Sequence, residues 1–137
     1  MTIYAKVKAV AKRRPLISRM PIEIDASAIV TSNDLISRIV RNNVQNYNNK
    51  AIDAPLFPYL TEDAIADKAK SGKIGFGDRK NENVQDEDEA VENALSCFAD
   101  GIFRMFINDV EVGVNQPISL EEGAEITFIR LTMLTGY

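Results

Sequence analysis

The sequence predicts a single α+β domain, and three stretches carry that prediction. Residues 2–24 alternate apolar and polar side chains around a basic turn, as the two strands of a hairpin do. Residues 31–47 repeat apolar side chains at helical spacing, and residues 101–131 hold β-branched and aromatic runs separated by turn residues. The length of 137 residues suits one hydrophobic core, so we expect residues 1–137 to form one domain.

The composition is ordinary for a soluble globular chain, with 45% hydrophobic and 26% charged residues. No apolar run approaches the ~20 residues of a membrane helix, and the N-terminus has no signal-peptide pattern. We therefore expect a cytoplasmic protein with no membrane contact.

The chain has one cysteine and no histidine. An internal disulfide and a Ser-His-Asp or Cys-His catalytic site are therefore excluded for this chain alone. The usual zinc ligand and general base are also missing, so we expect no metal, no cofactor and no catalytic residue. A carboxylate enzyme remains an alternative, although the sequence shows no paired carboxylate site for it.

The charges are distributed unevenly along a chain whose net charge is −4. Residues 1–30 carry six bases and two acids, whereas residues 53–100 carry twelve acids and five bases. Such an asymmetry can steer a charged partner, and it also describes two ordinary solvated faces.

The first strand of the predicted hairpin, residues 2–10, has two distinct sides. One side holds Ile3, Ala5, Val7 and Ala9, and the other holds Thr2, Tyr4, Lys6 and Lys8. Pro15 ends a basic turn at residues 12–15, because proline has no N–H to donate to a ladder. In the second strand, residues 16–24, Pro21 indicates an edge position or a bulge.

The helix over residues 31–47 begins at a capping hydroxyl. Thr31 or Ser32 can accept from the open N–H groups of the first turn, and Asp34 suits the positive end of the helix. Leu35, Ile36, Ile39, Val40 and Val44 recur at the spacing of one helical face.

Residues 48–100 have a weaker pattern, and we interpret them as an insertion in the domain. Asp86 and Glu89 have the spacing of a capping box, which predicts a helix over residues 86–98 that Gly101 ends. A short surface helix is expected over residues 61–70, followed by a glycine-rich turn or short edge strand at residues 73–80.

The last third of the chain predicts two strands and a short one between them. Residues 103–107 and 125–131 are rich in β-branched and aromatic side chains, and residues 111–112 form the short strand. Asn108-Asp109 supplies a tight turn after the first strand. Gly123 precedes the last strand at a sharp turn, because glycine accepts a positive φ.

This order of elements resembles the β-grasp, or ubiquitin-like, superfamily. Residues 104–112 resemble its third strand, turn and short fourth strand, and residues 118–129 resemble the stretch in which an "EGxEI" turn leads into the central last strand. The resemblance covers about 85 of the 137 residues, including the hairpin and helix at 2–47. It implies a mixed sheet with one main packing helix and, in this chain, a helical insertion at about residues 48–100.

The resemblance also implies a non-enzymatic module that binds another protein. In a β-grasp sheet one face is covered by the helix and the other is free. We expect the partner to meet the outward side chains of the strands and the tip of the hairpin. The candidate binding residues are Tyr4, Lys6, Lys8, Arg13, Arg14, Phe103, Met105, Thr127 and Ile129.

Two other functions remain open at this point. Sulfur carriers of the superfamily act through a C-terminal Gly-Gly, and this chain has Gly136 followed by Tyr137, so a carrier or modifier role would require removal of Tyr137. The second alternative is an immunity or inhibitor protein that covers a basic toxin with its acidic insertion.

Four further features are interpreted as ordinary structure. The acidic run at residues 86–92 lacks the glycine of a calcium loop and suits a helix N-terminus. The glycines at residues 75–77 do not match a phosphate-binding loop. Few aromatic residues interleave with the bases at residues 6–14, so no nucleic-acid partner is expected. Cys97 has no base to activate it.

Overall fold

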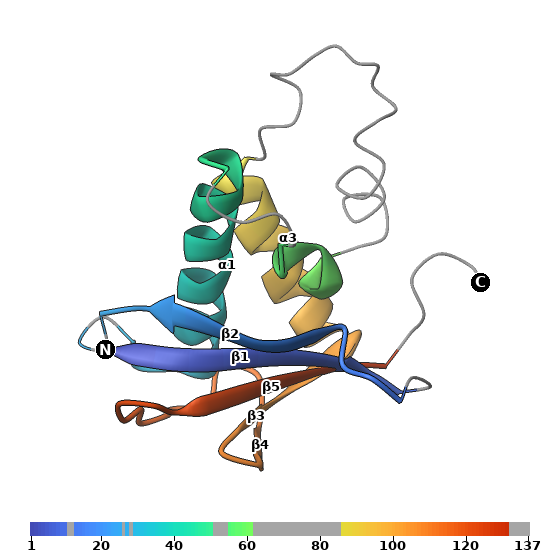
Figure 1. Ribbon diagram of the computed structural model, residues 1–137. Coiled ribbons are helices and arrows are strands. Elements are labelled where there is room, and N and C mark those ends of the chain that lie inside the picture. Colours follow the sequence, from blue (N-terminus) through green and yellow to red (C-terminus); the bar gives the residue numbers. More distant parts are fainter. Residues whose placement is uncertain (11–12, 26, 28, 51–54, 62–85, 132–137) are drawn as a thin grey trace.

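The computed structural model describes residues 1–10, 13–25, 27, 29–50, 55–61 and 86–131. The described chain forms a five-stranded mixed sheet with helices on one of its faces (Figure 1). The strands are β1 Thr2–Ala9, β2 Ile17–Glu23, β3 Phe103–Ile107, β4 Val110–Val112 and β5 Glu125–Arg130. The helices are α1 Ser32–Asn48, the 3₁₀ turn η2 Phe57–Leu60 and α3 Glu87–Ala99. The predicted α+β class is confirmed.

The strand order across the sheet is β2-β1-β5-β3-β4. The first and last strands, β1 and β5, lie side by side at the centre and run parallel, and the other pairs are antiparallel. β2 and β4 form the two edges. The first and last strands thus lie next to each other in the middle of the sheet, and residues far apart in sequence share one surface.

The predicted hairpin is formed by β1 and β2, and Pro21 lies on its edge strand opposite Tyr4. The N–H of Ile24 donates to the carbonyl of Met1 at 3.0 Å, and N–H directions alternate along a strand. The nitrogen of Pro21 therefore faces the outer edge of the sheet, where its lack of an N–H removes no hydrogen bond between strands. A register shift between Ala5 and Val7 places a bulge in this pair.

The turns of the last third match their residue types. Asn108 and Asp109 both have positive φ, 50° and 71°, as a two-residue type I′ hairpin turn requires. Gly101 ends α3 with φ +79°, and Gly123 precedes β5 with φ +83°. Both glycines occupy the left-handed region that favours them, as predicted.

Thr31 is the N-cap of α1. Its hydroxyl accepts from the N–H of Asp34 at 3.2 Å, and the Asp34 carboxylate accepts from the N–H groups of Thr31 and Val30, each at 3.0 Å. Ser32, the other candidate, is buried in the first turn and donates its hydroxyl to the carbonyl of Gly113 at 2.6 Å. This contact ties the start of the helix to the loop after β4.

α3 is part of the core. Asp86 caps it by accepting from the N–H of Glu89 at 3.1 Å, and its buried face includes Ala94, Cys97 and Phe98. The ring of Phe98 stacks on that of Phe103 in the sheet, with centroids 5.4 Å apart. The expectation of one main packing helix is therefore corrected, because α1 and α3 pack against each other above the sheet (Figure 1).

Two buried polar side chains hold η2 in place. The Oδ1 atom of Asn43 on α1 accepts from the N–H groups of Leu56 and Phe57, at 2.8 and 2.9 Å. Arg130 at the end of β5 donates through Nη1 to the carbonyls of Tyr59 and Thr61, at 2.9 and 3.1 Å. These bonds satisfy backbone groups that would otherwise be costly to bury. The expected helix over residues 61–70 and the turn at 73–80 lie outside the described residues, except for Thr61.

Candidate functional site

The candidate site is the face of the sheet that the helices leave uncovered. Along β1, Ile3, Ala5 and Val7 are buried beneath the helices, so the intervening side chains point to the opposite side. β5 alternates in the same way, with Ile126 and Phe128 buried. In Figure 1 the helices all lie on one side of the strands.

Strand register arranges the side chains of the opposite side into three rows. Residues paired across neighbouring strands share a face, so each row crosses the strands of the sheet at about a right angle. The rows are Pro21–Tyr4–Glu125, Lys6–Thr127–Phe106–Glu111 and Lys8–Ile129–Arg104. We call these residues, together with Arg19, the open face.

One end of the open face is closed by Arg19. Its guanidinium carbon lies 3.8 Å from the centre of the Tyr4 ring, and its Nη2 atom lies 2.9 Å from Oε2 of Glu125. A cation over an aromatic ring is attracted by the negative face of the ring. Tyr4 is therefore partly covered, and the charge of Glu125 is matched within the protein.

The rest of the open face is apolar and mainly basic. Phe106 and Ile129 are half-buried; Lys8 lies beside Ile129, and Lys6 lies in the row of Phe106, beyond Thr127. Among the residues that the structure describes, no carboxylate lies within salt-bridge distance of either lysine. Arg104 lies 3.4 Å from Glu111, with both side chains about half exposed, so this pair is weak.

Two of the predicted binding residues do not reach this surface. Phe103 and Met105 are 1% and 0% exposed, because the register of β3 turns them towards the helices. Phe103 contacts Phe98 and also meets Phe128 edge-on, at 5.7 Å. Their assignment to the surface was wrong, and Arg104 and Phe106 occupy the outward positions of β3.

Of the other predicted residues, Tyr4, Lys6, Lys8, Thr127 and Ile129 lie on the open face. Arg13 and Arg14 lie in the β1–β2 connection, and both are exposed to solvent. They extend the basic character of β1 beyond Lys8. Gly136, the attachment residue of the carrier alternative, lies outside the described residues.

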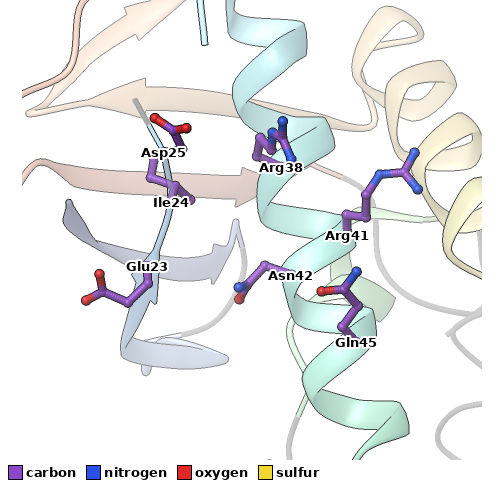
Figure 2. A pocket seen from close by; sticks show the side chains of 7 residues that line it. All are labelled: Glu23, Ile24, Asp25, Arg38, Arg41, Asn42 and Gln45. Carbon is purple, nitrogen blue, oxygen red and sulfur yellow. The ribbon is translucent and has the colours of Figure 1, made fainter. Parts of the chain in front are cut away.

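A separate pocket of about 140 Å³ lies between the end of β2 and α1 (Figure 2). It is lined by Glu23, Ile24, Asp25, Arg38, Arg41, Asn42 and Gln45. In Figure 2 the side chain of Asn42 points towards the strand, whereas Arg41 points away from it. Sequence reasoning missed this pocket, because its residues are ordinary surface types that only the packing of α1 beside β2 brings together.

Two of the charged groups of the pocket, Asp25 and Arg41, already have partners on their own chain. Asp25 accepts from the hydroxyl of Ser27 at 2.7 Å and from its N–H at 3.0 Å, and these bonds lower the pKa of Asp25. Arg41 donates to Asp88 on α3 at 2.9 Å, and this bond raises the pKa of Arg41. Two acids and two bases line the walls, so the pocket selects neither an anion nor a cation.

The described residues hold no group of three or more His, Cys, Asp or Glu side chains that could bind a metal ion. Cys97 is buried, and its thiol lies 3.4 Å from Oδ1 of Asn93. None of the helices within the described ranges combines the length and the apolar character that crossing a membrane requires.

We compared the chain with protein-family models, with curated proteins and with solved structures. None of the three comparisons found a match.

Proposed function

We propose that this protein is a non-enzymatic protein-binding module of β-grasp architecture, and that its partner docks on the open face. The β-grasp part of the proposal is supported by the strand order β2-β1-β5-β3-β4, with a parallel central pair and an N-terminal hairpin at one edge. α1 lies on one side of that sheet and packs against α3, and helices on one face only agree with the same architecture.

The observation that carries the binding role is that the central strands have only one covered face. β1 and β5 have helices on one side only. The other side presents Phe106 and Ile129 in adjacent rows. A half-buried aromatic and aliphatic pair with charged neighbours is typical of a protein-binding surface.

The edges of the sheet favour the open face over strand addition as the mode of binding. β2 has the Pro21 nitrogen on its outer edge and the charged residues Arg19 and Glu23 beside it. β4 has only three residues. Prolines, charges and short edge strands are the features that prevent another chain from extending a sheet.

Neither alternative function has comparable support. The carrier role depends on Gly136, which is outside the described residues. The inhibitor role depends on the acidic run, in which Glu87 and Asp88 already contact Arg41 at 3.4 and 2.9 Å. The open face carries two lysines, Lys6 and Lys8, that have no carboxylate within salt-bridge distance in the described part of the chain, beside the apolar pair Phe106 and Ile129.

Site-specific photo-crosslinking in native cells tests the proposal. A photoreactive residue at position 127 stands at the centre of the open face, and one at position 92 stands on the exposed side of α3. We expect discrete protein adducts from position 127 that disappear with Ile129→Asp, and none of these adducts from position 92. The same adducts from both positions, or adducts from position 127 that survive Ile129→Asp in a folded variant, would overturn the proposal.

A further inference from the structure

We infer that the surface recognised by the open face is acidic, and that it is a protein segment with carboxylates beside one large apolar side chain. This inference rests on the proposed function and adds the chemistry of the partner. It is carried by the charge balance of the open face and by the order of its residues across the strands.

The carboxylates of the open face are engaged, and two of its bases are not. Glu125 pairs with Arg19, and Glu111 pairs with Arg104. In the described part of the chain, Lys6 and Lys8 have no such partner, although they lie in neighbouring rows of the same strand. Arg13 and Arg14, exposed beyond the end of β1, add two more positive charges near that end. The net positive charge of this region contrasts with the overall charge of −4.

The apolar part of the open face has unpaired basic groups on its β1 side. Ile129 is paired with Lys8 there, and Phe106 is in the next row with Thr127 and Lys6. On the β3–β4 side, Arg104 is next to Ile129 and Glu111 is next to Phe106, and these two charges match each other. Carboxylates of the partner on the β1 side of an apolar side chain seated on Phe106 and Ile129 would complement this order.

The two kinds of contact are expected to contribute differently. Apolar anchors in the centre of an interface supply most of the affinity, and exposed charge pairs at its rim mainly raise the association rate. The rim pairs also weaken as salt screens them, over a Debye length of about 10 Å at 0.1 M ionic strength. Binding should therefore require Ile129 and should slow down with increasing salt.

Selection from a displayed library of random peptides, each about twelve residues long, tests this inference. The library is selected on the folded protein and then depleted on the folded Ile129→Asp variant, so that the remaining peptides depend on the open face. We expect these peptides to be rich in Asp and Glu around one Phe, Leu, Ile or Trp. The dissociation constant of a synthetic consensus peptide is then measured against matched variants.

Lys8→Glu and Lys50→Glu change the net charge equally, and Lys50 is an exposed residue just after α1. We expect Lys8→Glu to raise the dissociation constant of the consensus peptide about tenfold, because an ion pair is lost and a repulsion is added. Lys50→Glu should change this dissociation constant less than about twofold. Neutral or basic peptides, or equal effects of the two reversals, would overturn the inference and leave the proposed function standing. If no selected peptide depended on Ile129 for binding, both the inference and the proposed function would fail.

Discussion

The guanidinium of Arg19 on β2 lies 3.8 Å from the centre of the Tyr4 ring on β1 and donates a hydrogen bond to Glu125 on β5. This contact joins three strands at one end of the open face. It limits the apolar surface available to a partner, because Tyr4 is partly covered, and it leaves Phe106 and Ile129 as the accessible apolar pair.

The first prediction concerns this contact. Arg19→Met should lower the free energy of unfolding by about 1 kcal/mol, since exposed cation–π contacts and exposed ion pairs are each worth less than that. It should also lower the affinity for acidic peptides, because Glu125 becomes an unmatched negative charge. Urea unfolding and peptide titration measure the two effects. Arg19→Lys, which keeps the charge, should bind nearly as the native protein does, and equal losses in both variants would contradict the assigned role of charge.

The second prediction concerns the buried amide of Asn43. Asn43→Ala removes the acceptor of two buried N–H groups, those of Leu56 and Phe57. An unsatisfied buried donor costs about 1–3 kcal/mol, so we expect a loss of about 3 kcal/mol in the free energy of unfolding.

The neighbouring Asn42→Ala is the matched control for this measurement. Asn42 is only partly buried, and its Oδ1 atom accepts from Asn46 one turn further along α1. We expect its loss to cost less than about 1 kcal/mol. Equal urea midpoints for the two alanine variants would show that Asn43 does not hold η2.

The third prediction concerns Asp34 and pH. The N–H groups of Val30 and Thr31 donate to its carboxylate and lower its pKa below the ordinary value of 3.8. A lowered pKa means that the charged form stabilises the folded state above pH 3.8, and that this contribution is lost as the pH falls through the folded pKa.

Asp34→Asn keeps an acceptor oxygen and removes the charge. We expect it to lower the urea midpoint at neutral pH, and we expect the difference from the native protein to vanish in strong acid. Glu92→Gln, on the exposed side of α3, should leave the midpoint nearly unchanged. A difference between native protein and Asp34→Asn that stayed constant over the whole acid range would rule out the charge as its cause.

The fourth prediction concerns the edge strand. Pro21→Val restores an N–H on the outer edge of β2, where another chain could pair with it. We expect concentration-dependent self-association, measured by sedimentation velocity. Pro15→Val restores an N–H in the connection before β2 and should leave the protein at its native size. If the two variants sedimented alike, Pro21 would not be protecting the edge.

Local signals in the sequence predicted α1, α3 and the strands well, whereas η2 was not predicted. Thr31, Asp86, Gly101 and the turn at Asn108-Asp109 each act through a backbone group a few residues away, so their effect is visible in a short window. These residues set where helices and strands begin and end. The strand order, in contrast, depends on β1 meeting β5 across the whole chain.

The direction of the β3 side chains was the main error in the candidate site. Alternation in a strand divides residues into two sets, and it does not say which set is buried. Arg104 was the available signal, because a charged residue on one side of β3 points to burial of Phe103 and Met105 on the other. The burial of α3 through Phe98 was also missed, since a helical period cannot show what the apolar stripe will contact.

Buried polar residues were not predictable from the sequence. Asn43 and Arg130 are 1% and 3% exposed, although both residue types usually face water. They are buried because η2 presents backbone N–H and carbonyl groups to them.

Lysine reactivity in intact native cells tests the central claim most directly. An amine-reactive reagent is applied to cells and to the purified protein, and the modification of Lys6, Lys8 and Lys50 is compared by mass spectrometry. If a partner occupies the open face, Lys6 and Lys8 should be modified more slowly in cells than in the purified protein, while Lys50 reacts at similar rates in both. Equal protection of all three lysines, or no protection of Lys6 and Lys8, would contradict the account.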